Sequence, residues 1–112
     1  MAKITTHVLD TARGKPAAGV AVTLERKDGD AFVLVKRGET DDDGRNRALT
    51  DPDGVAAGTY RLTFALEAYF ARLGQEAFFP EAQVTFIVRN VSDHFHVPLL
   101  LAPFGFSTYR GS

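Results

Sequence analysis

HFHVPLLL, residues 94–101, is a β-strand pattern with one fully apolar side. Successive side chains of a strand point to opposite faces of its sheet, so alternate positions share a face. The larger apolar set is predicted to face a core: Phe95, Val97, Leu99 and Leu101. His96 then points away from that core. The segment therefore predicts a strand that is buried on one side and polar in part on the other.

The same two-residue period recurs through most of the chain, with Gly, Pro and Asp at the breaks. Further strands are predicted over residues 6–10, 20–26, 32–36, 58–64, 82–88 and 104–110, with a short segment near Arg47 to Leu49 and turns at 13–16, 27–30 and 41–45. About eight short strands with regular turns favour a β-sandwich, because two one-sided sheets bury their apolar faces against each other.

One segment departs from this period. Leu66, Tyr69, Phe70 and Leu73 fall at helical spacing, and Gly74 stands where a helix C-terminus favours glycine. The sequence therefore predicts one short helix in an otherwise all-β protein.

Length and composition limit the class of protein. The chain has 112 residues, which predicts a single domain over residues 1–112. The formal net charge of −1 gives no reason to expect nucleic acid or an anionic membrane as a partner. There is no cysteine, which excludes disulfides, thiolate metal sites and cysteine nucleophiles. Because no apolar leader or long apolar run is present, we expect a cytoplasmic protein.

Three ring-bearing polar side chains are predicted to point outward. If Ile4 and Val8 face the core, His7 lies on the opposite face of its strand, as His96 does on residues 94–101 and Tyr109 on the last strand. These outer faces also present Leu9, Pro98 and Leu100. A face that mixes apolar and titratable groups is typical of an interface, so we expect another subunit to cover it.

Other interpretations of the polar residues remain open. His94, His96 and a distant His7 could resemble a three-histidine zinc site, but such spacing is common by chance and no carboxylate is an obvious hydrogen-bond partner for such ligands. We therefore expect no metal and no cofactor, and interpret His94 as a solvated side chain. The run Asp41-Asp42-Asp43 lacks the spaced ligands of a calcium loop and is interpreted as a turn before Arg45.

The chain ends on Tyr109-Arg110-Gly111-Ser112, a phenol, a guanidinium and a hydroxyl directly after the β-prone aromatic residues 104–108. Free C-termini are commonly small, polar and frayed. Here the preceding strand could anchor the end in a sheet, so the terminus is predicted to be held in place.

Several of these segments together resemble one known family. They are THVLD at 6–10 with GKPA at 14–17, TDDDGR at 40–45, residues 94–101, and STYRGS at 107–112. The chain is similar over nearly its whole length to the 5-hydroxyisourate hydrolases, transthyretin-related enzymes of purine catabolism. The resemblance implies a transthyretin-like sandwich of two four-stranded sheets with one short helix. It also implies a homotetramer, a dimer of dimers with a channel between the dimers.

The resemblance further implies the hydrolysis of 5-hydroxyisourate to 2-oxo-4-hydroxy-4-carboxy-5-ureidoimidazoline, without a cofactor. His7 and His96 would serve as candidate bases for water, and Arg45 would orient the substrate and stabilise the oxyanion. Tyr109 and Arg110 would bind substrate, and Ser112 would supply a hydroxyl or the terminal carboxylate. The sites are expected at the interface between dimers.

The alternative is a non-enzymatic transthyretin-like carrier of a small aromatic ligand. Transthyretin proper resembles this chain in fold, but it lacks the histidines, the arginine and the Tyr-Arg-Gly-Ser ending. A carrier's channel is also expected to be more apolar, because buried His and Arg groups are costly to desolvate.

Overall fold

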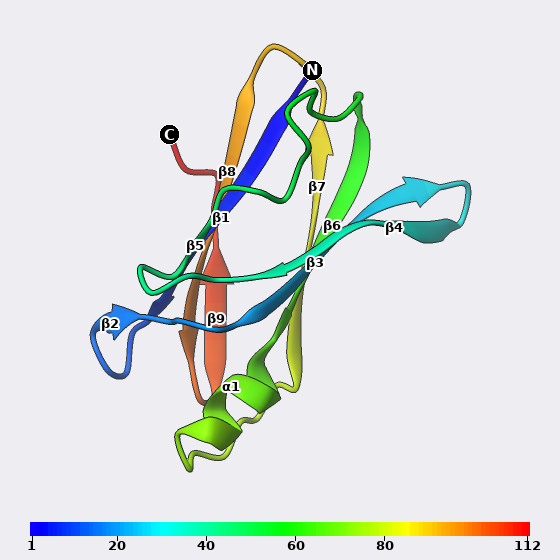
Figure 1. Cartoon of the computed structure of the whole chain (residues 1–112). Helices are drawn as coiled ribbons and strands as arrows, with labels where there is room; N and C mark the ends of the chain where they lie inside the picture. Colours follow the sequence, from blue (N-terminus) through cyan, green and yellow to red (C-terminus); the bar gives the residue numbers. More distant parts are fainter.

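The computed structural model describes all residues, 1–112, and shows two facing β-sheets with one helix at one end (Figure 1). The first sheet has the order β2 (Lys15–Pro16), β1 (Lys3–Asp10), β8 (His94–Ala102) and β9 (Gly105–Thr108), with β5 (Arg45–Asn46) also paired to β1. The second sheet has the order β4 (Ala31–Glu39), β3 (Ala21–Asp28), β6 (Gly58–Ala65) and β7 (Glu81–Val88). The predicted two-sheet sandwich is confirmed.

The fifth strand of the first sheet does not widen it. Strand β2 pairs with β1 at Leu9 and Asp10, whereas β5 pairs with β1 at Thr6 and His7. The two short strands therefore follow each other along one edge of β1. The sheet is four strands wide at β2 and three at β5, because β9 pairs only with the end of β8 from Leu99 onward.

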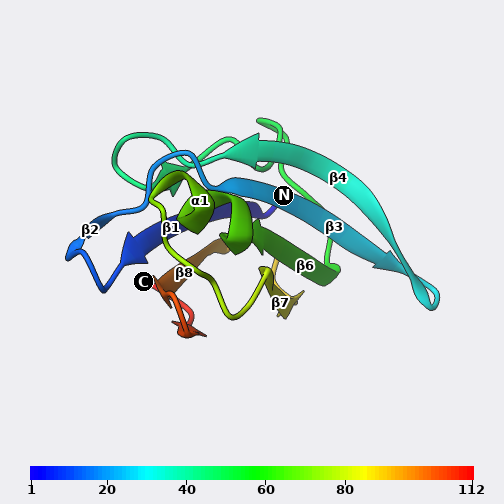
Figure 2. The same cartoon turned by 90° about the horizontal axis from the view of Figure 1, so that it is seen from below.

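Strands β1 and β8 run parallel and side by side, although about ninety residues separate them in sequence. Their register places Thr5 opposite His96 and His7 opposite Pro98. The second sheet is wholly antiparallel, and its β3–β4 hairpin projects beyond the rest of the sandwich (Figure 2).

The core lies between the sheets and contains 20 buried hydrophobic residues. The predicted apolar face of residues 94–101 is confirmed, because all four of its side chains are at most 6% exposed: Phe95, Val97, Leu99 and Leu101. Ile4 and Val8 are fully buried, and His7 is only half-buried, as the alternation predicts.

The helix α1 spans Leu66–Arg72, close to its predicted position, and buries Leu66, Tyr69 and Phe70. Gly74 follows it with φ of 67°, the left-handed conformation that glycine adopts most easily. The seven-residue helix is too short to cross a membrane.

Two local expectations are wrong. The short strand expected near Arg47 to Leu49 lies earlier, at β5, because the Asn46 side-chain oxygen accepts a hydrogen bond from the backbone N–H of Ala48 and so ends the ladder with a local turn. In addition, Lys15–Pro16, expected within a turn, pairs with β1.

Candidate functional site

A pocket of about 750 Å³ lies where β1, β5 and β8 meet the segment after β5 and the end of the chain. Three of the predicted site residues line it: Arg45 from β5, His96 from β8 and the terminal Ser112. Arg45 and His96 are 51 residues apart in sequence and come together because β5 and β8 both pair with β1. Ser112, 16 residues after His96, is brought back by the bridge between Gly111 and His96.

His96 is held by a neighbouring strand. The parallel register of β1 and β8 places Thr5 beside it, and the Thr5 hydroxyl oxygen lies 2.8 Å from His96 Nδ1. The same oxygen lies 2.8 Å from Nε2 of His94. His96 Nε2 makes no hydrogen bond within the chain, so it is the ring nitrogen available to a bound molecule.

The pKa of His96 lies below its ordinary value. Burial is the main cause, because it disfavours the charged imidazolium, and the positive charges of His94, Arg45, His7 and Arg47 lower it further. His96 is therefore a neutral imidazole at neutral pH, which is the form that can accept a proton.

Arg45 is positioned by the turn that precedes it. The Asp41 carboxylate accepts hydrogen bonds from the backbone N–H groups of Asp43 and Arg45, each at 2.9 Å. Both bonds lower the pKa of Asp41, and the bond from Arg45 has the larger effect. Gly44 adopts φ of 76° and leaves no room for a side chain, since a Cβ there would lie 2.3 Å from the Val8 carbonyl oxygen. The acidic run thus forms the predicted turn.

His7 lies beside the pocket without lining it. Its backbone is paired with Arg45 on one side and with Pro98 on the other, and it is near enough for its protonated form to lower the pKa of His96. No three His, Asp or Glu side chains are arranged to hold a metal ion.

The C-terminus is held in place, as predicted. The backbone N–H of Gly111 donates to the carbonyl of His96 at 2.8 Å and forms a bridge that continues the β8–β9 pairing. A Cβ on Gly111 would lie 2.7 Å from Cδ2 of His96 and 3.3 Å from Cγ of Pro98. Glycine is therefore needed for the chain to pass over the His96 ring and bring Ser112 into the pocket.

Tyr109 and Arg110 do not join these residues within one chain. They line a different hollow of about 250 Å³, together with residues of β7 and β8. The Arg110 guanidinium lies 4.6 Å from the ring centre of Phe95 and 3.6 Å from the Asp93 carboxylate. Tyr109, Arg110 and Ser112, expected to act together at one site, are therefore divided between two hollows within the single chain, with Ser112 alone in the first.

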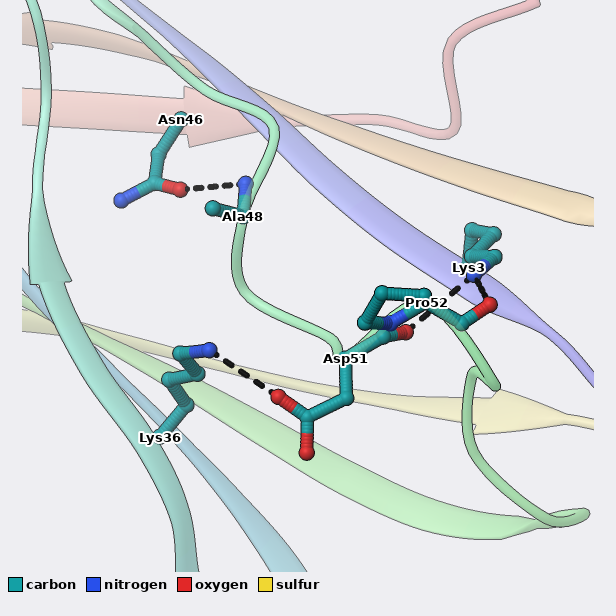
Figure 3. A network of polar contacts seen from close by, with 6 residues as sticks. All are labelled: Lys3, Lys36, Asn46, Ala48, Asp51 and Pro52. Carbon is teal, nitrogen blue, oxygen red and sulfur yellow. Dashed lines mark hydrogen bonds and ion pairs between the residues drawn. The ribbon is translucent and has the colours of Figure 1, made fainter.

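Positively charged residues that the sequence did not single out also line the pocket: Lys3, Lys36 and Arg47. Figure 3 shows how two of them hold the segment after β5. Lys36 pairs with the Asp51 carboxylate at 3.1 Å, and Lys3 donates to the carbonyls of Asp51 and Pro52. No local motif marks these residues, since each comes from a different segment.

His94 also lines the pocket, contrary to its interpretation as an ordinary solvated side chain. It is exposed, as expected, yet it is bonded to Thr5. The His-x-His spacing was the available signal, because alternate residues of a strand share a face.

The fold and the pocket together define a transthyretin-like β-sandwich whose pocket combines a neutral histidine with a surplus of positive charge. Such a pocket suits a small, polar or anionic molecule and a reaction that begins with proton removal.

The comparisons with known proteins agree with this class. Residues 4–111 match the model of the HIUase/Transthyretin family, and the chain belongs to that family. It is 45% identical to a 5-hydroxyisourate hydrolase of Caulobacter vibrioides, over the whole of both chains. The structure of Klebsiella pneumoniae 5-hydroxyisourate hydrolase is 41% identical, with a TM-score of 0.89 and complete coverage of both chains. Transthyretin from Sparus aurata is 30% identical, with a TM-score of 0.91 and coverage of 97% of this chain and 96% of that one.

Proposed function

We propose that this chain is a hydrolase that converts 5-hydroxyisourate to 2-oxo-4-hydroxy-4-carboxy-5-ureidoimidazoline. The relatives that bear this activity in their names cover the chain from end to end. The observation that carries the proposal is the single pocket that contains the neutral His96 imidazole, the Arg45 guanidinium and the terminal Ser112.

In the proposed reaction, water adds to a ring carbonyl of the substrate. His96 accepts a proton from the water as the oxygen forms its bond to carbon, and Arg45 stabilises the negative charge on the carbonyl oxygen. The ring C–N bond then breaks, and the leaving nitrogen takes up the proton that His96 accepted, which returns His96 to its neutral form. A guanidinium suits the second task because it stays charged and can contact two acceptors of a planar substrate at once.

His7 is a second candidate base and substrate contact, beside the pocket and paired with Arg45. Ser112 supplies a hydroxyl or the terminal carboxylate. Tyr109 and Arg110 bind substrate in the complete site. Because they line another hollow of their own chain, we propose that a second subunit delivers these side chains or rearranges the tail.

This division fits a homotetramer, a dimer of dimers, with the sites at the interface between dimers. The half-buried Leu9 and Leu100 lie on the outward side of the strands that carry His7 and His96, and a second subunit would cover them. We further propose that residues 1–112 act as one domain, without a cofactor, in cytoplasmic purine degradation.

The experiment is an ultraviolet assay of the purified full-length chain. Urate oxidase generates 5-hydroxyisourate in the cuvette, and the decay of this intermediate is followed with and without the protein. The proposal requires decay faster than the spontaneous rate and proportional to protein concentration. A decay rate unchanged by the protein would contradict it.

The same assay separates the enzyme from a transthyretin-like carrier. A carrier binds a ligand stoichiometrically and does not turn over. The cationic lining argues for the enzyme, since four positively charged side chains face the pocket against two carboxylates, that of Asp51 and the terminal one of Ser112: Lys3, Lys36, Arg45 and Arg47. A carrier of an aromatic ligand is expected to have an apolar pocket.

A further inference from the structure

The Thr5 hydroxyl stands between two imidazoles. Its oxygen is 2.8 Å from His94 Nε2 and 2.8 Å from His96 Nδ1, and the residue is 9% exposed. The three residues come from two strands whose parallel pairing fixes their spacing. The contact is therefore part of the sheet and does not depend on a mobile loop.

A hydroxyl carries one hydrogen, so it can donate to one of the two rings and accept from the other. If Thr5 donates to His94, then His96 must donate from Nδ1 and keeps a lone pair on Nε2. If Thr5 donates to His96 instead, neutral His96 carries its proton on Nε2. The direction of one O–H bond thus determines whether His96 presents a base or a donor to the pocket.

The charges around the pocket favour the first direction. Arg45 and Arg47 stay charged and act on His96 with positive charge, whereas His94 and His7 add to it only when they are protonated. The first direction applies when His94 is neutral, since a protonated His94 would donate to Thr5. A lone pair directed toward positive charge is stabilised, whereas an N–H dipole directed toward it is repelled. On the other side, His94 is exposed, so its Nδ1 can hold its proton toward water.

We propose that Thr5 is a positioning residue that holds His96 in the tautomer with its proton on Nδ1, by accepting from that nitrogen and donating to His94. The inference deepens the proposed hydrolase and rests on His96 acting there as the base. Nε2 of His96 is thereby kept as an acceptor for the proton of water. His94 acts indirectly: it accepts the hydrogen bond from the Thr5 hydroxyl, so Thr5 cannot donate to His96 at the same time.

The tautomer can be measured without substrate. Long-range proton–nitrogen correlation spectra of the 15N-labelled full-length protein, recorded at neutral pH, distinguish a protonated from an unprotonated ring nitrogen. Signals are assigned with the His7→Gln and His94→Gln variants. Protonated Nδ1 and unprotonated Nε2 in His96 are expected. Neutral His96 with its proton on Nε2 in the wild-type chain would overturn the proposal.

Variants of Thr5 test the hydroxyl. Thr5→Val keeps the branched shape but removes the hydroxyl, so His96 is expected to shift toward the Nε2-protonated tautomer. Turnover should fall by roughly 10- to 100-fold, within or below the range typical for loss of an acid or base itself. Thr5→Ser restores the hydroxyl and should recover both the wild-type tautomer and most of the activity. An unchanged His96 tautomer in Thr5→Val would refute the proposal.

His94 provides a second test. His94→Phe removes the acceptor, so the Thr5 hydrogen is free to turn to His96 and the tautomer should shift as in Thr5→Val. His94→Gln offers an amide oxygen as a new acceptor and should shift it less. If His94→Phe leaves the His96 spectrum unchanged, His94 has no part in setting the direction.

Thr63→Val is the matched control. It removes a buried hydroxyl on β6 that has no hydrogen-bond partner, so neither spectrum nor turnover should change. The two proposals can also fail separately. A chain that does not hydrolyse 5-hydroxyisourate but shows the Nδ1 tautomer would defeat the function alone, and an active chain with the Nε2 tautomer would defeat the role of Thr5 alone.

Discussion

Gly111 shows how one missing side chain places the end of the protein. Its backbone crosses the His96 ring at a distance that leaves no space for a Cβ, and its N–H is bonded to the His96 carbonyl. The residue has no need of a left-handed conformation, since its φ is not positive. The requirement for glycine is therefore one of space alone.

Gly111→Ala should displace the tail and the ring together. We expect kcat/KM for 5-hydroxyisourate to fall by at least about 10²-fold, because small displacements of catalytic groups are costly. The melting temperature should change little, since the tail is exposed. Gly105→Ala is the control, because a Cβ there meets nothing within 4 Å. Equal activity in the two variants would contradict the role of Gly111.

Replacement of the candidate bases tests their roles directly. His96→Ala removes the neutral imidazole from the pocket, and kcat should fall by about 10²–10⁴-fold if His96 accepts the proton from water. We expect a loss of about the same size for His7→Ala. Turnover is measured on freshly generated 5-hydroxyisourate, with circular dichroism as a check on the fold. Near wild-type turnover in either variant would remove that residue from the mechanism.

The lowered pKa of His96 predicts the pH dependence of the reaction. A base must be neutral to act, so kcat/KM should fall only when the pH drops below a pKa that is lower than that of an ordinary histidine. Arg47 contributes to this lowering. Arg47→Gln should therefore raise the pKa and move the acidic limb of the pH profile to higher pH.

Arg37→Gln removes the same charge from an exposed position on β4 and is the matched control for this profile. The two variants have equal net charge, so a difference between their profiles reports position. If the acidic limb of the pH profile stays at the same pH in Arg47→Gln, the proposed effect of the Arg47 charge on the pKa of His96 is contradicted.

At the level of elements, the helix is joined to the first sheet by a buried polar contact. The Tyr69 hydroxyl donates to the Asp10 carboxylate at 2.8 Å, and Asp10 is fully buried at the end of β1. The other oxygen of Asp10 accepts from the backbone N–H groups of Ala12 and Arg13. Burial, and then the bond to Asp10, raises the pKa of Tyr69. The contact fixes both the helix and the turn after β1.

Tyr69→Phe should destabilise the protein by about 1–3 kcal/mol, because it leaves a buried carboxylate oxygen without its hydroxyl partner. The measurement is the midpoint of denaturant unfolding. The pocket lies elsewhere on the sheet, so kcat below the unfolding transition should be unchanged. A midpoint equal to that of the wild type would show that this contact contributes nothing to stability.

For the whole molecule, the proposed tetramer should be visible in solution. Sedimentation equilibrium is expected to give four times the mass of one 12.2 kDa chain. Leu100→Asp introduces a charge on the outward side of β8 and should weaken assembly and turnover together, because an unpaired charge is costly to bury. Leu34→Asp changes an exposed leucine of the second sheet and should do neither. A fully active monomer at assay concentration would contradict a site shared between subunits.

Much of this arrangement follows from local pattern. The alternation in residues 94–101, the period of the helix around Tyr69 and the turn before Arg45 each depend on neighbours a few residues away, and each is found where it was expected. The two wrong expectations arose because only the alternation of apolar and polar residues was used. The position of β5 depends on a hydrogen bond of the Asn46 side chain, and the pairing of Lys15–Pro16 depends on the neighbouring strand β1; the alternation shows neither.

The amino-acid pattern was sufficient for the sandwich, for the outward direction of His96 and for the residue types that carry the proposed chemistry, because side-chain direction is a local property of a strand. Which residues surround them in the folded protein could not be predicted from this local pattern. The parallel register of β1 and β8 sets Thr5 between two imidazoles, the return of Gly111 brings Ser112 to His96, and the segment after β5 adds Lys3 and Lys36. Such contacts join residues that are far apart along the chain, so they exist only once the sheets have closed.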